Sequence, residues 1–455
     1  MTVYERLRQQ VLAMLDHERI DPRTSPERVK TLVARAVSDY QQGAETGTDA
    51  RLRDAHEMAD RLLAAVTAFG PLTDILARPE VEEVFIEGSR VTYMDRNGRL
   101  HGLQAPTTEA ENRAVIDRLL ASTTRTLDTR NPIVQARVLD GRARLSAAIP
   151  PVAEGLSATI RRHSRRRHSL DGLVSTGSLS QPAAALLGLV MQGWSSVLVS
   201  GQPGCGKTSL LTGLLAAAPP GRCVRVCEEI RELTVPLTHG SYYETRSPSP
   251  TGEAAITLRD LVKFCLGMRC ELLVVGEVRG PEAFELTRAV NAGCGFACTV
   301  HANSGQDALE ALTNAAIMAG ENVPERMVRK IFSSAIDLVV HIDLHDRSDG
   351  VVRREVREIV AVMPHVGDVF ATEPIFTRPA GPGTALEWTG VIPATIGRFE
   401  RLLPPSVTLR QLLAGAGGGS EEGPQGGSSG RHVAERVSGA DQTPVGTPVG
   451  SEATG

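Results

Sequence analysis

The residues best placed by type and spacing to do chemistry lie at 201–209, where the chain reads Gly-Gln-Pro-Gly-Cys-Gly-Lys-Thr-Ser. This stretch fits the pattern G-x-x-x-x-G-K-[ST], in which backbone N–H groups surround phosphates, the lysine reaches the β and γ oxygens, and the hydroxyl binds Mg²⁺. A Gly-rich turn that contains Lys-Thr by chance is the alternative. We therefore expect nucleoside-triphosphate binding by Gly201, Gly204, Cys205, Gly206, Lys207, Thr208 and Ser209.

Apolar segments flank this stretch on both sides. Val197, Leu198 and Val199 precede it, and residues 210–218 are mostly apolar. A buried strand before the loop and a helix after it are the context that the pattern requires. The phosphates would then lie at the positive N-terminus of a helix.

Polar side chains also follow three later apolar runs. Glu229 and Glu232 follow the first, Glu277 follows the second and His301 follows the third. Hydrolysis of a phosphoanhydride needs Mg²⁺, a carboxylate that orients water, and cations on the transferred group. Each strand end alone fits a capped strand equally well, and a lone histidine is more often structural. Because sites in open α/β sheets gather at the carboxyl ends of strands, three such ends favour one shared site.

The composition limits the class of protein. The chain has 455 residues, with 49 basic and 53 acidic side chains. A prior of about 150 residues per domain predicts about two to three domains. The near balance of charge disfavours nucleic acid as a partner. The seven cysteines never form C-x-x-C, which is typical of the reduced thiols of a cytosolic protein.

No apolar window approaches the roughly 18 residues that span a bilayer, and the first residues lack the apolar core of a signal peptide. We therefore expect a cytoplasmic protein whose role at a membrane is peripheral.

Changes in composition and in the spacing of apolar residues divide the chain into five parts. Residues 1–69 predict a helical extension, 70–162 a small α+β domain, 163–175 a basic linker, 176–412 an α/β domain, and 413–455 a disordered tail. The alternation of strand and helix in the fourth part predicts a parallel sheet with both faces covered.

Two of these parts allow more than one interpretation. The helical extension is either a docking arm for a partner or a segment that packs against the next domain. The basic linker is a solvated connector, a phosphate contact across a domain cleft, or a site of attraction to anionic lipid.

On these motifs the chain resembles the secretion ATPases. Residues 201–209, 228–233, 276–280 and 299–303 look like their Walker A motif, aspartate box, Walker B motif and histidine box. Within that superfamily the chain is similar to the tight-adherence (CpaF-type) pilus assembly branch. The shorter matches to that branch are at 72–76, 140–142, 148–151, 159–161, 244–246, 259–263 and 268–269. The resemblance covers roughly residues 70–412.

The resemblance implies a RecA-like P-loop ATPase domain preceded by an N-terminal lobe. It further implies a cytoplasmic homohexamer that clamps ATP with Mg²⁺. Such a hexamer works with inner-membrane platform proteins to assemble or retract a pilus.

The same resemblance assigns roles to residues. Lys207 and Thr208 hold phosphates and Mg²⁺, and His301 senses the γ-phosphate. Glu232 and Glu277 share the water-activating and metal-side roles, with Glu232 favoured for the water. The candidates to reach phosphates from the N-terminal lobe, the same subunit or its neighbour are Arg144, Arg161 and Arg246.

The chain departs from the family pattern at two positions. Cys294 stands where the family has the first histidine of the histidine box, and Glu229 replaces the aspartate of the aspartate box. The first departure bears on the coupling of hydrolysis to motion, and the second on the reach of the carboxylate.

Three functions follow as alternatives. The leading one is an ATP-hydrolysing assembly motor. The second is a non-catalytic scaffold that uses nucleotide as a structural ligand, and Cys294 and Glu229 support it. The third is a DNA-translocating motor of conjugation type, and the arginine-rich linker supports it.

Overall fold

The computed structural model of the chain describes residues 3–22, 24–47, 51–103, 106–162, 168–234, 237–246, 254–320, 322–346, 352–364, 367, 369–380 and 384–415. Residues 163–167 of the expected basic linker, and 416–455 of the expected tail, lie outside these ranges.

Three helices make up the start of the described chain: α1 (Val3–His17), α2 (Pro26–Thr46) and α3 (Ala55–Thr67). They pack around an apolar cluster in which Leu7 and Val11 are fully buried. The apolar spacing that predicts helices in this region therefore also supplies their common core.

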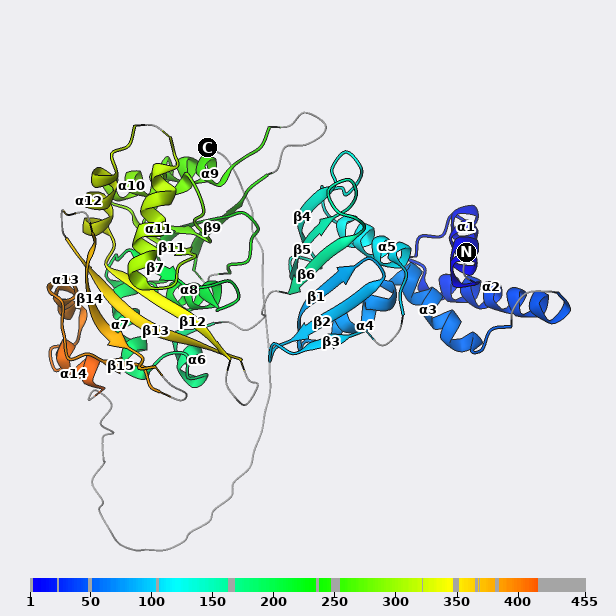
Figure 1. Ribbon diagram of the computed structural model, residues 1–455, viewed down its shortest axis with the longest axis horizontal. Helices are drawn as coiled ribbons and strands as arrows, with labels where there is room; N and C mark the ends of the chain where they lie inside the picture. Colours follow the sequence, from blue (N-terminus) through cyan, green and yellow to red (C-terminus); the bar gives the residue numbers. More distant parts are fainter. Residues whose placement is uncertain are drawn as a thin grey trace, which may run out of the picture. The chain divides into compact units, whose positions relative to one another are not determined.

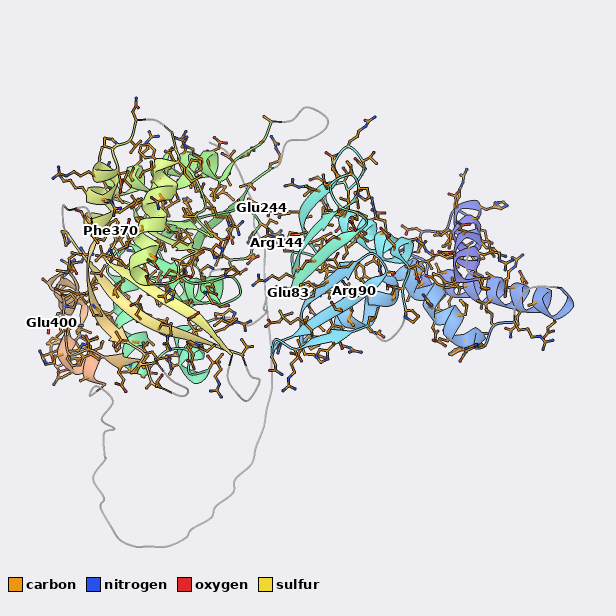
Figure 2. All side chains as sticks on the ribbon, viewed as in Figure 1. Glu83, Arg90, Arg144, Glu244, Phe370 and Glu400 are labelled. Carbon is orange, nitrogen blue, oxygen red and sulfur yellow. The ribbon has the colours of Figure 1, made fainter. Side chains whose placement is uncertain are left out.

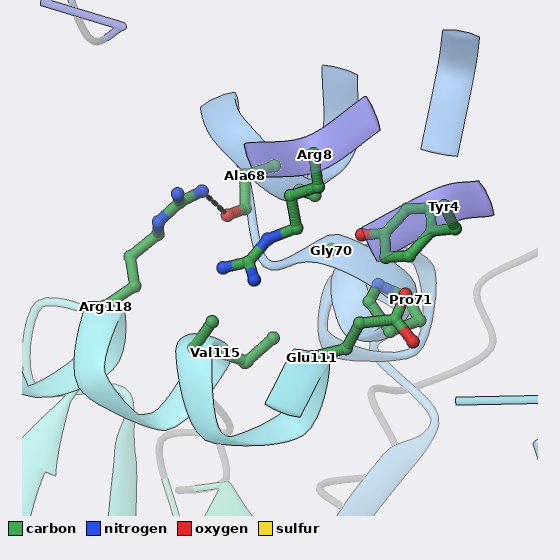
Figure 3. A pocket seen from close by; sticks show the side chains of 10 residues that line it. Tyr4, Arg8, Ala68, Gly70, Pro71, Glu111, Val115 and Arg118 are labelled. Atoms are coloured by element: carbon green, nitrogen blue, oxygen red, sulfur yellow. Dashed lines mark hydrogen bonds between the residues drawn. The ribbon is translucent and has the colours of Figure 1, made fainter. Parts of the chain in front are cut away.

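The helical extension contacts helix α5 (Glu109–Leu120) of the following α+β region (Figure 3). Arg61 of α3 pairs with the buried carboxylate of Glu111 at 2.8 Å. Arg118 of α5 donates a hydrogen bond to the carbonyl of Ala68 (Figure 3). These contacts agree with the interpretation of the extension as a segment that packs against the next domain.

A six-stranded antiparallel sheet follows, in the order β3-β2-β1-β6-β5-β4. Its strands are β1 (Val81–Glu87), β2 (Arg90–Asp95), β3 (Leu100–Gly102), β4 (Ile133–Val138), β5 (Ala143–Ala148) and β6 (Ser157–Arg162). The short helices η1 (Gly70–Leu72) and α4 (Thr73–Ala77) precede it. Buried side chains alternate along β5, so one face of the sheet packs with Ile116 and Leu119 of α5 into one core.

The remaining strands form a nine-stranded sheet in the order β15-β14-β13-β12-β7-β11-β10-β8-β9 (Figure 1). The strands from β12 to β9 in this order are parallel, and β13, β14 and β15 are added antiparallel. Their bounds are β7 (Val197–Ser200), β8 (Cys223–Glu228), β9 (His239–Glu244), β10 (Leu272–Val275), β11 (Gly295–Val300), β12 (Leu338–Asp346), β13 (Val352–Met363), β14 (Ala371–Thr377) and β15 (Glu387–Trp388).

Helices cover both faces of this sheet (Figure 1). One face packs on α6 (Leu170–Ser175), α7 (Gln181–Gln192), α8 (Lys207–Ala216), α13 (Ala394–Gly397), η2 (Arg398–Leu402) and α14 (Leu409–Ala414). The other face packs on α9 (Leu258–Leu266), α10 (Glu282–Asn291), α11 (Gly305–Ile317) and α12 (Glu325–Ala335). Every residue of β7 and β10 is buried, as expected for strands covered on both faces.

This arrangement confirms the predicted fold class, an α/β phosphate-loop domain preceded by a small α+β domain and a helical extension. The residue boundaries between these parts stay predictions. Across the described ranges, no helix has both the length and the apolar character to cross a membrane.

Candidate functional site

The phosphate loop joins β7 to α8, as the sequence predicts. Gly201, Gly204 and Gly206 have φ values of 153°, 78° and 98°, which side chains disfavour. Gly206 is the N-cap of α8, and no side chain caps that helix end. The first N–H groups of α8 are therefore available to an anion such as a phosphate, as is typical of a helix N-terminus.

The start of the loop lies tightly against strand β12. A Cβ atom at Gly201 would lie 2.1 Å from the carbonyl oxygen of Ile342. Ser200, one residue earlier, has its hydroxyl 3.0 Å from Nδ1 of the buried His341 on the same strand. These contacts hold the start of the loop against β12.

The ammonium group of Lys207 is folded into the loop. Its Nζ donates hydrogen bonds to the carbonyls of Gly201 and Gln202 at 3.0 and 3.1 Å. It also lies 3.2 Å from Nδ1 of His301. Burial lowers the pKa of Lys207. Because loop carbonyls alone do not neutralise a buried ammonium, the site suits an anionic ligand.

His301 connects Lys207 to Glu277. The imidazole Nε2 lies 2.5 Å from Oε1 of Glu277. Burial, together with the charge of Lys207, lowers the pKa of His301 and favours the neutral ring. Since an ammonium can only donate, Nδ1 accepts from Lys207 and the ring proton resides on Nε2, which donates to Glu277.

Arg279 extends this series to Glu229. It forms an ion pair with the carboxylate of Glu277 and lies 3.6 Å from that of Glu229. The longer side chain at 229 therefore still reaches the group of charges. The structure thus brings together Lys207, His301, Glu277 and Glu229, which the sequence places on separate strand ends.

Glu228 is a residue of this region that the sequence analysis missed. Its buried carboxylate accepts the backbone N–H groups of Glu232 at 3.0 Å and Leu233 at 3.1 Å. Burial raises the pKa of Glu228 to about 7. Gly276 makes room for this side chain, because a Cβ there would lie 2.7 Å from Cγ of Glu228.

The carboxylate of Glu232 is not joined to the central group. Among the described residues, no hydrogen bond or ion pair links it to Lys207, His301 or Glu277. Its backbone N–H is held by the carboxylate of Glu228. The preference for Glu232 as the residue that activates water therefore stays a prediction.

Arg354 is a second residue that the sequence analysis missed. It lies on β13, and its Nε donates to the carbonyl of Gly204 at 2.9 Å. A Cβ at Gly206 would lie 3.3 Å from its Cδ. The two partners are 150 positions apart, so no local motif could have indicated this contact.

The three predicted arginines lie in other contacts. Arg144 donates to Gln135, and Arg161 pairs with Glu83 at 3.2 Å, both inside the six-stranded sheet (Figure 2). Arg246 donates to the carbonyl of Ala254 at 3.1 Å. Their approach to a phosphate, in the same or a neighbouring subunit, stays a prediction.

The residues present fit a phosphate-bound Mg²⁺. Thr208 lies in the first turn of α8, beside Lys207. Within the described ranges, no group of three His, Cys, Asp or Glu side chains could hold a metal ion. Mg²⁺ keeps several waters and is bound by one or two protein oxygens together with substrate phosphates, and the hydroxyl of Thr208 and the carboxylate of Glu277 are oxygens of that kind.

Cys294 lies away from this group. It precedes β11, whereas His301 follows the carboxyl end of the same strand. The departure from the family pattern at 294 therefore lies at the other end of the strand from the candidate site.

Comparison with known proteins gives one family. A family described as "Type II/IV secretion system protein" matches residues 69–363. A candidate conjugal transfer protein of Mycobacterium tuberculosis (strain H37Rv) is 30% identical over 318 residues, covering 68% of this chain and 89% of that protein. The type IV secretion system protein PtlH of Bordetella pertussis is 28% identical over 295 residues, covering 59% of this chain and 87% of PtlH.

Solved structures give weaker likenesses. The VirB11 ATPase of the Brucella suis type IV secretion system, in complex with sulphate, is 21% identical and has a TM-score of 0.34. It covers 64% of this chain and 91% of its own. The ATPase DotB of Yersinia pseudotuberculosis is 14% identical and has a TM-score of 0.46. It covers 64% of this chain and 77% of its own. These scores are too low to support an inference about the site.

Proposed function

We propose, on the premise that this chain belongs to the type II/IV secretion system protein family and is one of its ATPases, that it hydrolyses ATP with Mg²⁺ to power a pilus or secretion machine. The machine is of the tight-adherence pilus type or a related type, at the inner face of the membrane. The observation that carries this proposal is the hydrogen-bonded series from Lys207 through His301 to Glu277. It joins the phosphate loop to two strand ends.

The glycine loop is the part of the site that would hold the triphosphate. Its N–H groups and the uncapped start of α8 would bind phosphate oxygens, with Lys207 at the β and γ positions. Thr208 and, through waters, Glu277 would hold Mg²⁺. The bound ATP supplies the phosphoanhydride bond that is cleaved, and Mg²⁺ supplies a divalent charge that offsets the negative charge of the phosphates.

His301 is placed to report an occupied γ-phosphate position. In the structure its Nδ1 accepts from Lys207 and its Nε2 donates to Glu277. When Lys207 turns to a phosphate oxygen, Nδ1 loses its donor. The hydrogen bond from Nε2 to Glu277 would then change in strength, because a donor at Nδ1 polarises the ring, and this change links nucleotide state to the strand end at Glu277.

Glu228 and Glu232 support a water-orienting role together. Glu228 holds the backbone N–H groups of Glu232 and Leu233, so the side chain of Glu232 starts from a fixed point. Positioning of the attacking water is the main task of a protein carboxylate in such hydrolysis.

A homohexamer that works with inner-membrane platform proteins is part of the proposal. In such a ring, Arg144, Arg161 or Arg246 would supply the cation that stabilises charge on the transferred phosphoryl group.

The experiment that tests hydrolysis measures phosphate release from ATP by the purified full chain. We expect release with Mg²⁺, loss of release after chelation of Mg²⁺, and loss in Lys207→Ala and in Glu277→Ala. Unchanged turnover in both variants would contradict the proposal. For the pilus assignment, we expect neighbouring reading frames that encode two multi-span membrane proteins and a small pilin-like protein.

Conjugal DNA transfer is a second candidate, because the M. tuberculosis relative and the TrbB relative of Rhizobium radiobacter carry conjugal transfer in their names. DNA would then raise the rate of ATP hydrolysis, with a steep dependence on salt. An ATPase rate that DNA leaves unchanged at low salt argues for the pilus or secretion machine instead.

The scaffold alternative has less support. Cys294 lies at the far end of β11 from His301, and Glu229 remains within 3.6 Å of Arg279. Tight nucleotide binding without hydrolysis in the assembled oligomer would nevertheless favour a scaffold.

A further inference from the structure

Two pairs of thiols lie in contact beneath the parallel strands. The Sγ atoms of Cys270 and Cys294 are 3.4 Å apart, at the amino ends of β10 and β11. Those of Cys227 and Cys265 are 3.5 Å apart, between β8 and α9. The two pairs thus have nearly the same separation in one domain.

The pairs differ in exposure. Cys227 and Cys265 are both 0% exposed, inside the apolar core. Cys270 is half-buried, and Cys294 is 6% exposed. A reagent in solution can therefore reach Cys270 in the folded protein, whereas Cys227 and Cys265 require opening of the core.

Arg222 distinguishes the pair at 270 and 294 further. This arginine is 3% exposed and donates through one guanidinium nitrogen to the carbonyl of Met191 at 3.1 Å. Its Nε and its other terminal nitrogen have no hydrogen-bond partner among the described residues. A buried guanidinium with two unused donors favours an anion beside it.

Arg222 has two acidic neighbours, the carboxylate of Glu271 and, with a smaller effect, the thiol of Cys294. Hydrogen bonding with Cys270, and to a smaller extent the charge of Arg222, lowers the pKa of Cys294. A thiolate at Cys294 would stand next to the sulfur of Cys270.

We propose that Cys270 and Cys294 form a reversible thiol-modification site, which closes to a disulfide by exchange with a low-molecular-weight disulfide. The site lies at the end of β10 and β11 opposite Glu277 and His301. It is therefore separate from the candidate nucleotide site.

The exchange balances without a further oxidant. The S–H of the accessible Cys270 gives its proton to the adjacent Cys294 thiolate as the sulfur of Cys270 attacks one sulfur of the small disulfide, which forms a mixed disulfide and releases one small thiolate. Cys294 passes this proton to the released thiolate, and the Cys294 thiolate then attacks the sulfur of Cys270, which forms the protein disulfide and releases the second small thiolate. Counted from two protein thiols, two protons and two electrons pass from the protein to the small disulfide.

The geometry allows this closure with little movement. β10 and β11 are neighbouring parallel strands, with Leu272 opposite Gly295. Cys270 lies two residues before Leu272 and Cys294 one residue before Gly295, so the two cysteines lead into neighbouring strands, and their Sγ atoms are already 3.4 Å apart.

The test treats the full chain with glutathione disulfide, alkylates the remaining thiols, and maps the peptides by mass spectrometry. We expect a peptide linked through 270 and 294, formed at least about tenfold faster than any link through 227 and 265. A reducing agent should restore both thiols. Equal rates for the two pairs would mean global opening and would overturn the proposal, as would a chain whose Cys270 and Cys294 stay reduced.

Variants separate the two steps. In Cys294→Ser, Cys270 should stop at the mixed disulfide and gain the mass of one glutathione. The matched control, Cys265→Ser, should close the link between 270 and 294 as the native chain does. Thermal unfolding of both variants checks that they are folded. If Cys270 also stops at the mixed disulfide in the native chain, the proposed closure is wrong. The variant Cys270→Ser, in which Cys294 should react at least about tenfold more slowly than Cys270 does in the native chain, tests the order of attack.

Discussion

The two ends of the parallel strands carry the same kinds of side chain in opposite arrangements. At the amino ends, Glu271 accepts the backbone N–H of Cys223, and Asp337 accepts that of Ser196, each at 2.9 Å, and each of the two also pairs with an arginine side chain. At the carboxyl ends, Glu277 instead pairs with two side chains, those of His301 and Arg279.

The kind of partner indicates what each carboxylate can do. A carboxylate bound to backbone N–H groups at a strand start cannot release them without loosening the sheet, so it acts in stability. A carboxylate bound to side chains can exchange partners when a ligand arrives. Glu228 is the exception, because it lies at a carboxyl end but binds backbone N–H groups.

The largest expected effect concerns Lys207. We expect Lys207→Ala to lower the rate of ATP hydrolysis about 10³-fold, because the variant removes a buried cation from the developing phosphate charge. The matched control is Lys263→Ala, which removes a lysine that pairs with Glu285 on the helical layer. A comparable loss of turnover in both variants would contradict the assignment of the site to the carboxyl ends.

Glu228 should show itself in the pH dependence of stability. Its pKa is raised from 4.5 to about 7 in the folded chain, so the folded state binds the proton more tightly than the unfolded state. Its contribution is therefore full below pH 4.5 and is lost as the pH rises through about 7, a change on the order of 3 kcal/mol.

Chemical unfolding of the native chain and of Glu228→Gln across this pH range measures the contribution. The free energy of unfolding should fall with pH in the native chain and fall less in the variant. Equal slopes would show that Glu228 is not the group that titrates.

Glu277→Gln should affect catalysis more than binding. Neutralising this carboxylate removes the acceptor for His301 and the partner of Arg279, and we expect turnover to fall about 10²-fold. Nucleotide affinity, measured by calorimetry, should change only about a few fold. Glu271→Gln, at the other end of the sheet, is the control and should keep its turnover.

The smallest expected effect is that of Asp337→Asn. This change weakens the ion pair with Arg398 and the acceptor for the N–H of Ser196. Since Arg398 is half exposed, we expect a loss of only about 2 kcal/mol in the free energy of unfolding. Turnover per folded molecule should be unchanged. A fall in turnover without a fall in stability would contradict the assignment of Asp337 to stability alone.

Local signals account for what the sequence could predict. The loop at 201–209 could be predicted because an apolar run, three glycines and a second apolar run follow one another within a few residues. The buried strands β7 and β10 could be predicted because β10 is a continuous apolar run and β7 is one up to its last residue, Ser200.

What escaped prediction depends on distant contacts. Strand β9 has no fully buried residue and no apolar run, so only its pairing with β8 defines it. The role of Glu228 rather than Glu229 depends on which side chain turns inward beside Gly276. Arg354 meets the loop only because β13 folds back over it.

The absence of slack between Gly201 and Ile342 has a mechanical consequence. A single methyl group at position 201 would overlap the β12 carbonyl. The hairpin of β12 and β13 is therefore in tight contact with the phosphate loop at this point. A displacement of that hairpin would therefore press directly on the phosphate loop. A phosphate that displaces the loop would in the same way press on the hairpin.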